Sequence, residues 1–488
     1  MTGNDIDHSI GRLAVAHRRA VRGRMMRSGL CGLITLCGNL AHGAASGAWQ
    51  VAVFEADITC PIGHPLMGGG IAPASEVVTP LLAKGMVLLG PDKPVVVAAL
   101  DWCEVRNDAY DRWREALAEA AGTNRERVIL SSVHVHDAPV ADLYAQRLLD
   151  EAGQFGSLID AEFFESSVRK TADALRGSLA GTRPVTGYGI GRAEVKEIAS
   201  NRRVRLNDGT VGFHRGSMTL DEDLRSQPAG EIDPWLRVLS FWDGDTPVAG
   251  ITVYAVHPMS YYGQGGVSHD FPGIARERLQ EANAGAFQIY MSGCSGDVTA
   301  GKWYDDAREN RMVLADKLYG AMTEAWKTTV RHPLDSVSFR NTALRLAPIN
   351  AGNYTKDAMR STLANAAETT FRRNQAAMGL SWVRRVDSGQ PIDLPALDFG
   401  KAVLVLMPAE AFVGYQAMAQ AMRPDSTVLT PGYGECAPGY ITTDAADADH
   451  FEDNWRWVGD GSEALIRAAL DEVLRRPDAG ASAAVNPR

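Results

Sequence analysis

Residues 93–136 read KPVVVAALDWCEVRNDAYDRWREALAEAAGTNRERVILSSVHVH, and this stretch decides the fold class. It begins with a run of valine, alanine and leucine that predicts a buried strand. Apolar residues then recur at helical spacing over 109–122, and a second apolar strand is predicted over 127–136. A strand, a helix and a strand in succession are typical of an α/β or mixed α+β fold, with a layered sheet core and flanking helices.

The same alternation continues along the chain on both sides of this stretch. A helical insert of mixed charge is expected over 355–385, and a strand that runs into a helix over 399–422. No repeat or clear linker interrupts the pattern, so we predict one large domain over 48–476 and a disordered tail over 477–488. Further strands are expected at 50–59, 84–90, 187–194, 236–242, 247–258, 286–293 and 337–349, and further helices at 161–179, 271–283 and 305–326.

The composition is that of a globular protein, with 45% hydrophobic and 22% charged residues among 488. The net charge is −10, and beyond Arg27 no concentrated run of lysine and arginine occurs. Nucleic-acid-binding proteins instead carry a basic patch or stripe. The sequence therefore excludes a nucleic acid as the expected partner.

Residues 1–47 have the layout of an export segment. Five arginines precede Met25, an apolar run extends from Leu30 to about Leu40, and small residues follow. This layout is typical of a secretory signal peptide behind a basic lead, and the run is shorter than the ~20 residues that span a bilayer. We therefore expect a secreted or periplasmic protein. The alternative is a disordered basic tail followed by a buried apolar helix.

The six cysteines give no zinc-binding pattern. Two of them, Cys31 and Cys37, lie in the export segment, and the others are far apart without any C-x-x-C pair. A structural zinc site made of cysteines is therefore not expected, and export would allow one or two disulfides. The four outside the export segment are Cys60, Cys103, Cys294 and Cys436.

His134 and His136 end the predicted strand 127–136, in SSVHVHDAP. Residues two apart on a strand face the same side, so both imidazoles can point at one spot and form a metal-ligand pattern. A chance pair at an exposed strand end is the alternative. Hydrolases of the metallo-β-lactamase type also use H-x-H but continue with Asp-His, where this chain has Ala138–Pro139.

His257 and Glu410 also stand where apolar runs end, in ITVYAVHP and VLVLMPAE. Taken alone, His257 would be a core histidine with a partner, and Glu410 would be a glutamate at a helix N-terminus. Tyr440, in PGYITT, would by itself be a packing tyrosine. Because ligands gather at strand ends in α/β folds, the histidines and the glutamate become candidates for one site.

Two further segments have the character of site loops. SHDFPG, at 268–273, follows His257, and MSGCSGDVT, at 291–299, is a turn of small residues that can present backbone N–H groups to an oxyanion. A tight connection between elements would also need such glycines. Arg202, in NRRVRLNDGT, is either part of a loop salt bridge or an anion clamp.

In this order the segments resemble the neutral/alkaline non-lysosomal ceramidase family, and the resemblance covers nearly the whole chain after the export segment. On this resemblance, 48–476 is a ceramidase-like catalytic domain. The matching segments are FEADITCPIG (54–63), LSSVHVHDAP (130–139), NRR (201–203), VHPMS (256–260), SHDFPG (268–273), the Gly-Asp turn (296–297), PAE (408–410) and YITT (440–443).

The resemblance implies a zinc ion held by two histidines, a glutamate and a tyrosine, which here are His134, His257, Glu410 and Tyr440. His136 remains an alternative to His134 as a ligand. It is otherwise expected to hydrogen-bond the substrate or transfer a proton. The resemblance also implies that Arg202 lines the site and that Thr299 stands where the family has a catalytic serine.

The function implied is a zinc-dependent amidohydrolase that cleaves the amide bond of a ceramide-like N-acyl lipid by a zinc-activated water, in sphingolipid metabolism. Peripheral contact with a membrane would accompany a lipid substrate. The alternatives are a zinc hydrolase of another amide or ester, acting on a small molecule, and a family member without activity. All four implied ligand positions carry the expected residue types, which argues against a family member without activity.

The chain departs from the family pattern at three places. Thr299 and Ala300 replace the serine and proline after the Gly-Asp turn, and Asp137–Ala138–Pro139 replaces Ser-Gly-Pro. We also expect no immunoglobulin-like C-terminal domain, because the chain ends soon after 476. We expect these departures to affect which substrate is cleaved more than they affect the zinc chemistry.

Overall fold

Two five-stranded sheets form the centre of the computed structural model, which describes residues 49–206, 208–213 and 215–476. The first sheet runs in the order β6 (Val128–Ser132), β4 (Val95–Leu100), β3 (Leu82–Leu89), β1 (Trp49–Asp57) and β8 (Arg183–Val185). The second runs in the order β16 (Phe287–Ser292), β14 (Thr246–Tyr254), β13 (Trp235–Asp243), β9 (Gly187–Glu194) and β18 (Val330–Pro333). Each sheet is antiparallel except for one parallel pair, β4 with β6 and β14 with β16.

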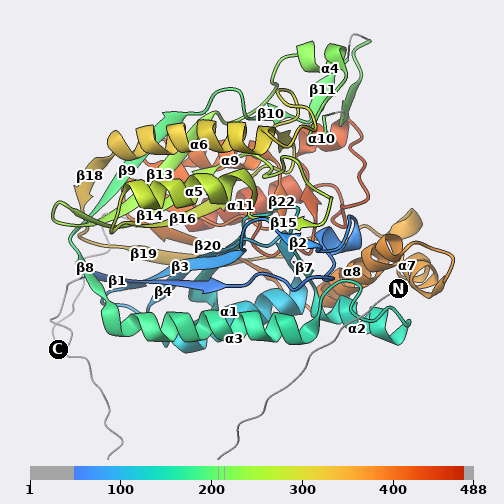
Figure 1. The fold of residues 1–488 in the computed structure, drawn as a ribbon, viewed down its shortest axis with the longest axis horizontal. Coiled ribbons are helices and arrows are strands. Elements are labelled where there is room, and N and C mark those ends of the chain that lie inside the picture. The colour runs from blue at the N-terminus through green and yellow to red at the C-terminus, as the bar shows by residue number, and fades with distance from the viewer. Residues whose placement is uncertain (1–48, 207, 214, 477–488) are drawn as a thin grey trace, which may run out of the picture. The chain divides into compact units, whose positions relative to one another are not determined.

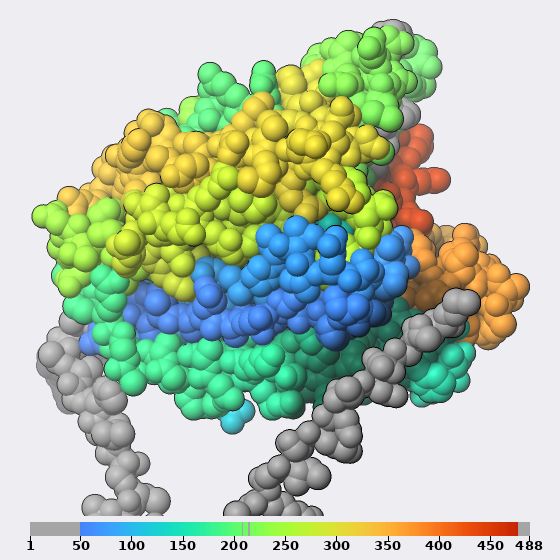
Figure 2. Space-filling view, viewed as in Figure 1, coloured from blue at the N-terminus to red at the C-terminus, as the bar shows by residue number. Residues whose placement is uncertain are grey.

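Helices cover the outer faces of both sheets, so that the layers follow one another as helices, sheet, sheet and helices (Figure 1). The helices α1 (Asn107–Ala121) and α3 (Ala161–Ser178) pack on the first sheet, and α5 (Asp270–Ala282) and α6 (Asn310–Lys327) pack on the second. The inner faces meet where β16 contacts β3, β4 and β6. Figure 2 shows the same order as surface bands, from yellow α6 and yellow-green α5 through the blue first strands to green α3.

This layering explains the continuous apolar runs. All six residues of β4 are buried, because one face of that strand meets a helix and the other meets the second sheet. Strands buried on both faces show no polar alternation. A buried ion pair joins the layers, since Arg276 of α5 donates to both carboxylate oxygens of Asp101 at 2.7 and 2.9 Å.

A third sheet carries the C-terminal part of the described chain. Its strands are β19 (Ser338–Leu344), β20 (Ile392–Asp398), β21 (Ala402–Val405) and β23 (Thr427–Leu429), and they are covered by α9 (Val413–Met422) and α11 (Ser462–Leu474). Between β19 and β20 the insert forms α7 (Lys356–Ala364) and α8 (Thr370–Asp387), and α8 packs on α2 (Leu143–Glu151).

Short strand pairs and helices hold the loops at the ends of the sheets. The pairs are β2 (Glu76–Val77) with β15 (Gly266–Val267), β5 (Glu104–Val105) with β7 (Val140–Ala141), β10 (Ser200–Asn201) with β17 (Val298–Thr299), β11 (Arg203–Arg205) with β12 (Val211–Phe213), and β22 (Glu410–Ala411) with β24 (Tyr440–Ile441). The short helices are α4 (Glu222–Ser226) and α10 (Asp444–Ala448).

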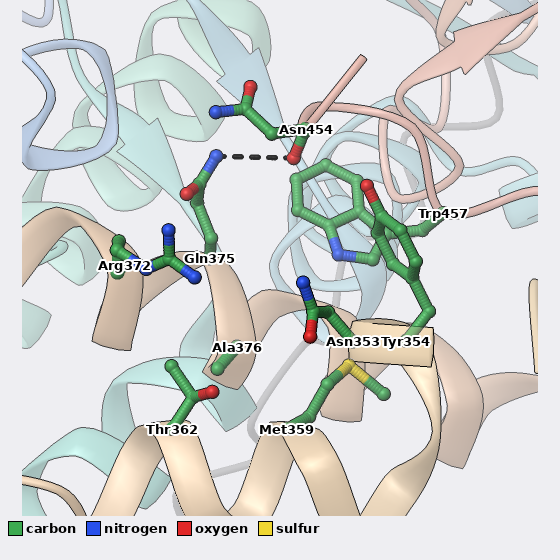
Figure 3. Close-up of a pocket in the computed structure, with 9 residues that line it drawn as sticks. All are labelled: Asn353, Tyr354, Met359, Thr362, Arg372, Gln375, Ala376, Asn454 and Trp457. Carbon is green, nitrogen blue, oxygen red and sulfur yellow. Dashed lines mark hydrogen bonds between the residues drawn. The ribbon is translucent and has the colours of Figure 1, made fainter. Parts of the chain in front are cut away.

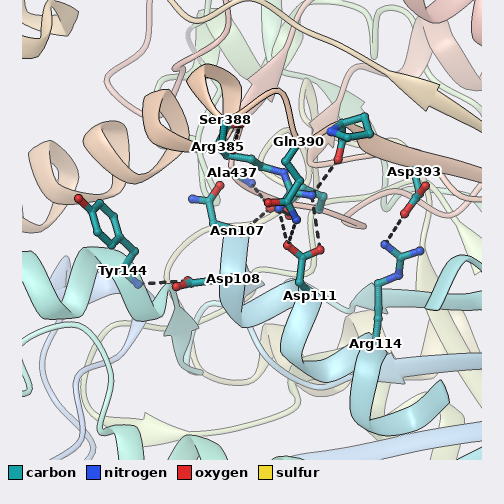
Figure 4. Close-up of polar contacts among 12 residues, drawn as sticks. Asn107, Asp108, Asp111, Arg114, Tyr144, Arg385, Ser388, Gln390, Asp393 and Ala437 are labelled. Carbon is teal, nitrogen blue, oxygen red and sulfur yellow. Dashed lines mark hydrogen bonds and ion pairs between the residues drawn. The ribbon is translucent and has the colours of Figure 1, made fainter. Parts of the chain in front are cut away.

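A buried polar cluster fastens the insert to the first layer (Figure 4). Arg385 of α8 donates to Asp111 of α1 at 2.7 Å and lies 3.3 Å from the carboxylate of Glu435. Gln390 donates to the same aspartate at 2.5 Å. The cluster joins α8 to α1 and to the loop that follows β23, close to the candidate site described below.

The expected mixed α+β fold with a layered sheet core and flanking helices is confirmed. The predicted insert is two helices, and the strand predicted over 127–136 ends at Ser132. The predicted export segment 1–47 and tail 477–488 lie outside the described residues. Among the described residues, the four cysteines are free and buried, and no helix has the length and apolarity needed to cross a bilayer.

We expect Arg385→Ala to lower the free energy of unfolding by about 3–5 kcal/mol, because it leaves the carboxylate of Glu435 buried without its cation and removes the nearer of two arginines from Asp111. Urea denaturation followed by circular dichroism measures this change. The matched control is Arg360→Ala, because Arg360 pairs with Asp357 at the surface and both side chains are largely exposed. That change should stay within about 0.5 kcal/mol. Equal losses in the two variants would contradict the structural role of the cluster.

Candidate metal centre

The site is built where the two parallel strand pairs end. The chain that leaves β6 carries His134, and the chain that leaves β14 carries His257. His134 has φ of 70°, in the left-handed region that few residues other than glycine adopt, and its N–H donates to Trp102 O at 3.0 Å. The backbone therefore turns away from the sheet at the histidine, and its ring stacks on Tyr433 with centroids 4.2 Å apart.

Three side-chain atoms meet between these loops. The Nε2 atoms of His134 and His257 are 3.0 Å apart, and Glu410 Oε2 lies 3.4 Å from the first and 3.3 Å from the second. Glu410 is the register partner of Tyr440 in the short parallel pair β22–β24, which places both residues in this region. All four side chains are buried.

Backbone carbonyls fix how the two imidazoles present their nitrogens. His134 Nδ1 lies 2.9 Å from Cys103 O, and His257 Nδ1 lies 2.9 Å from Ser295 O. A carbonyl oxygen only accepts, so each Nδ1 carries the proton and each Nε2 presents a lone pair. Two lone pairs and a carboxylate oxygen therefore face one another at close range.

Such an arrangement fits a cation. Glu410 Oε2 is buried and has no hydrogen-bond partner among the described residues, which is costly for a carboxylate. Ligand atoms around a tetrahedral ion with bonds of about 2.1 Å lie roughly 3.4 Å apart, close to the separations in this site. His134, His257 and Glu410 thus fit as ligands of a divalent metal ion, with a backbone carbonyl orienting each imidazole.

Burial sets the protonation of the two imidazoles and of Glu410. Burial lowers the pKa of His134 to about 4 and that of His257 well below its ordinary value, so both rings are neutral at neutral pH. Burial raises the pKa of Glu410 to about 8, and the positive charge of Arg202 opposes that rise. Neutral imidazoles are the form that binds metals.

His136, Arg202 and Tyr440 surround this centre. The ring of His136 lies 5.3 Å from those of His134 and His257, and its buried Nδ1 has no hydrogen-bond partner among the described residues. Arg202 Nη1 donates to the hydroxyl of Tyr440 at 2.7 Å. Burial raises the pKa of that hydroxyl and Arg202 opposes the rise, so the tyrosine presents an oxygen held by a cation.

The turn of small residues at 291–299 packs against the centre. A Cβ at Gly296 would lie 2.2 Å from Glu410 O, so only glycine allows this approach. Ser295 O holds His257, and Gly296 O accepts from Arg202 at 3.4 Å. Thr299, at the end of the turn, is fully buried on β17 and donates its hydroxyl to Gly216 O at 2.7 Å.

A cavity of about 240 Å³ opens beside the centre. The predicted residues His134, His136, His257, Glu410 and Tyr440 all line it. Arg202 reaches it through Tyr440, while Thr299 is bonded into the adjoining turn. The other lining residues are Met67, Cys103, Tyr262, Phe371, Asp453, Asn454 and Trp455.

Sequence reasoning missed Glu104 and Asp453. Glu104 is fully buried, pairs with Arg106 at 2.6 Å, and offers a carboxylate oxygen within 4.8 Å of ligand atoms of His134 and Glu410. A carboxylate in the apolar run CEV was a usable signal, because such a group needs a partner when it is buried. Asp453 gave no signal, because it stands among several other acidic residues of the same segment, such as Asp449 and Glu452.

The two histidines also reach the site differently from the prediction. They were expected to share one face of a strand, but the strand stops at Ser132 and both lie beyond it in irregular backbone. The positive φ at His134, and not strand alternation, directs its ring to His257 and Glu410.

No protein-family model matches the chain, and no curated protein matches it by sequence. Solved structures do match. A neutral ceramidase from Pseudomonas aeruginosa aligns with a TM-score of 0.65 and 16% identity, covering 88% of this chain and 74% of its own. The chain has the fold of a neutral ceramidase. A ceramidase complexed with C2 gives the same TM-score and identity over 88% of this chain and 75% of that one.

The resemblance found in the sequence is thereby confirmed at the level of the fold. The metal-capable groups on this neutral ceramidase fold are His134 with His136 and His257, and His134 with Glu104 and Glu410. Both contain His134, so that histidine is the common member of every arrangement that the described residues offer.

We expect the purified protein to bind about one divalent metal ion per chain and His257→Ala to weaken that binding by more than about 100-fold. Changes to the outer partners of a ligand alone cost 10–100-fold. Metal content by plasma mass spectrometry and thermal unfolding with and without chelator measure the loss. The control is His332→Ala, because His332 lies on β18 against Tyr188. Unchanged metal content in His257→Ala would contradict the site.

Proposed function

We propose that this protein is a zinc-dependent amidohydrolase that cleaves the amide bond of an N-acyl lipid of the ceramide type. The observation that carries the proposal is the meeting of two imidazole lone pairs and a buried carboxylate on the fold of a neutral ceramidase. The donor set of nitrogen and oxygen atoms suits zinc. A lipid substrate would be taken up through peripheral contact with a membrane surface.

In this proposal His134, His257, Glu410 and Tyr440 hold the ion. A zinc ion in such a site lowers the pKa of a water molecule and polarises a carbonyl group. The residues around it supply the rest of the chemistry. Arg202 keeps a positive charge in the buried region where negative charge would develop on the amide oxygen, and it orients Tyr440 through the 2.7 Å hydrogen bond.

His136 is proposed as the residue that hydrogen-bonds the substrate and moves the proton. Its ring lines the cavity beside Tyr262, and its Nδ1 has no partner among the described residues. Burial, followed by the neighbouring His134 and Arg202, lowers its pKa well below the ordinary value, so it begins the reaction as a neutral base. A positioned base of this kind contributes about 10²–10⁴ in rate.

Thr299 is proposed to hold in place the segment that supports Arg202. Its hydroxyl holds Gly216 O, and the N–H of Arg215, the residue before Gly216, lies 3.3 Å from Arg202 O. The hydroxyl therefore fixes the segment that supports Arg202. A threonine keeps this bond where the ceramidase family has serine, because both side chains carry the same donor.

His134→Ala and His136→Gln should separate metal binding from turnover. We expect the first variant to lose zinc and activity together, and the second to keep about one zinc per chain while hydrolysis of a fluorescent N-acylsphingosine falls about 10²–10⁴-fold. Metal analysis and fluorescence assays on the same samples measure both. Loss of zinc in His136→Gln, with zinc retained in His134→Ala, would show that His136 and not His134 is the zinc ligand. Zinc binding without hydrolysis of any amide or ester would refute the proposed hydrolase activity.

We also propose that residues 1–47 direct export and that the mature protein is secreted or periplasmic. The basic lead and the short apolar run support this proposal. Fusion of residues 1–47 to a reporter that folds only outside the cytoplasm should give an active exported reporter. The control fusion replaces Leu33 and Leu36 with arginine, which interrupts the apolar run. Equal reporter activity in both fusions would overturn the proposal.

A further inference from the structure

His136 is held differently from the two histidines of the metal centre. The imidazoles of His134 and His257 are each fixed by a hydrogen bond from Nδ1 to a backbone carbonyl, at 2.9 Å in both cases. The Nδ1 of His136 is buried and has no hydrogen-bond partner among the described residues. Because an imidazole rotates broadly about χ2 when nothing restricts it, the packing of neighbouring rings sets the orientation of His136.

Of the three described rings that contact His136, that of Tyr262 is the nearest. Its centroid lies 4.7 Å from that of the imidazole and the two planes are inclined by 88°, whereas the rings of His134 and His257 lie 5.3 Å away. Perpendicular aromatic rings at this separation attract each other edge to face. Tyr262 also lines the metal cavity, so the contact is made at a wall that a substrate would meet.

A hydrogen-bonded bridge ties the two ring-bearing segments together. Asp137 follows His136 in the chain, and its buried Oδ1 accepts the N–H of Gly263 at 2.8 Å. Gly263 in turn follows Tyr262. The other oxygen of Asp137 accepts from Arg311 of α6 at 3.1 Å. The bridge therefore fixes the loop that carries the tyrosine relative to the backbone of the histidine.

A second buried carboxylate holds the other end of the same loop. Asp270, the first residue of α5, accepts the N–H of Ser260 at 2.9 Å. Arg311 donates to the hydroxyl of Ser260 at 3.0 Å and also to the carbonyl oxygen of Tyr261. The position of the tyrosine ring between these anchors is thus set before any ligand arrives.

The bridge explains one of the departures from the ceramidase pattern, because Asp137 stands where the family has serine. A serine hydroxyl has a single oxygen and no charge. It could not accept from the N–H of Gly263 through one oxygen and from Arg311 through another. The aspartate of this chain therefore makes a connection that a serine at this position would not make.

The wall of the metal cavity that the insert supports is fixed as well. Gln375 of α8 donates to Asn454 O at 3.1 Å (Figure 3), and the indole N–H of Trp455 donates to Glu104 at 2.9 Å. Asn454 and Trp455 both line the metal cavity. With these walls in place, the alignment of His136 with a bound amide depends on the orientation of its own ring.

We infer that Tyr262 is a positioning residue, whose ring holds the imidazole of His136 in the orientation in which it meets the amide of the substrate. The inference rests on the proposed function for the role of His136. Tyr262 acts through the contact of the two rings, and its hydroxyl is not needed for this. The effect on the rate is large, because a displacement of roughly 1 Å in a reacting group costs about 10²-fold.

Tyr262→Leu should lower kcat for a fluorescent N-acylsphingosine about 10–100-fold while the zinc content stays the same. Tyr262→Phe keeps the ring and should retain the wild-type kcat. The matched control is Tyr261→Leu, because the neighbouring tyrosine packs on the exposed Arg308 with the guanidinium 4.9 Å from its ring centre. This control should also retain the wild-type kcat. Equal losses in Tyr262→Phe and Tyr262→Leu would overturn the inference.

The same substitution made in His136→Gln tests whether Tyr262 acts through the histidine. Tyr262→Leu should cause no further loss of kcat in that background, because two residues that act as a unit are not additive. A loss by the same factor in both backgrounds would overturn the inference. Loss of zinc in Tyr262→Leu would also overturn it, since the tyrosine would then act on the metal ligands.

Nuclear magnetic resonance of protein with isotopically labelled histidine separates this inference from the proposed function. The Cε1–H signal of His136, identified by its absence from His136→Gln, should move in Tyr262→Leu, where the ring current of the tyrosine is lost, and stay in place in Tyr261→Leu. An unmoved signal in Tyr262→Leu, with cleavage of N-acylsphingosine by the wild type, would refute this inference alone. A moved signal without cleavage of any amide by the wild type would refute the proposed function and leave the contact of the two rings standing.

Discussion

The rest of the site depends on two hydrogen bonds from imidazole to backbone. Cys103 O and Ser295 O each fix one histidine with its Nδ1 protonated, so that two lone pairs point at each other 3.0 Å apart. Without a cation this contact brings two partial negative charges together beside the carboxylate of Glu410. The folded chain therefore favours a positive charge at this point, and the raised pKa of Glu410 reflects the same preference.

The same arrangement of strands and helix occurs twice in the fold and brings these groups together. In each central sheet, a parallel pair of strands is bridged by a helix, and a histidine follows the strand end. Parallel pairs bring strand ends to one edge, where side chains from distant parts of the sequence meet. The third contribution comes from β22 and β24, whose two-residue pairing sets Glu410 beside Tyr440. The glycine at 296 lets the intervening turn approach closely enough to support this pair.

The insert of α7 and α8 extends the site rather than the core. Its buried arginine, Arg385, anchors it to α1, and its Gln375 donates to the backbone of Asn454, which lines the metal cavity. The metal cavity combines the aromatic rings of Phe371 and Trp455 with the polar groups of the centre. The insert therefore adds an aromatic wall, Phe371, to the metal cavity.

The sequence by itself determined the layered fold and the chemical types at the site, because apolar periodicity marks strands and helices, and histidines after apolar runs mark where strands end. It placed His134, His257, Glu410 and Tyr440 as one group through the order of the segments. Only the tertiary structure decided which histidine faces the carboxylate, because that depends on a positive φ and on carbonyls from Cys103 and Ser295. Glu104 and Asp453 likewise acquire their surroundings only when loops far apart in the chain are packed together.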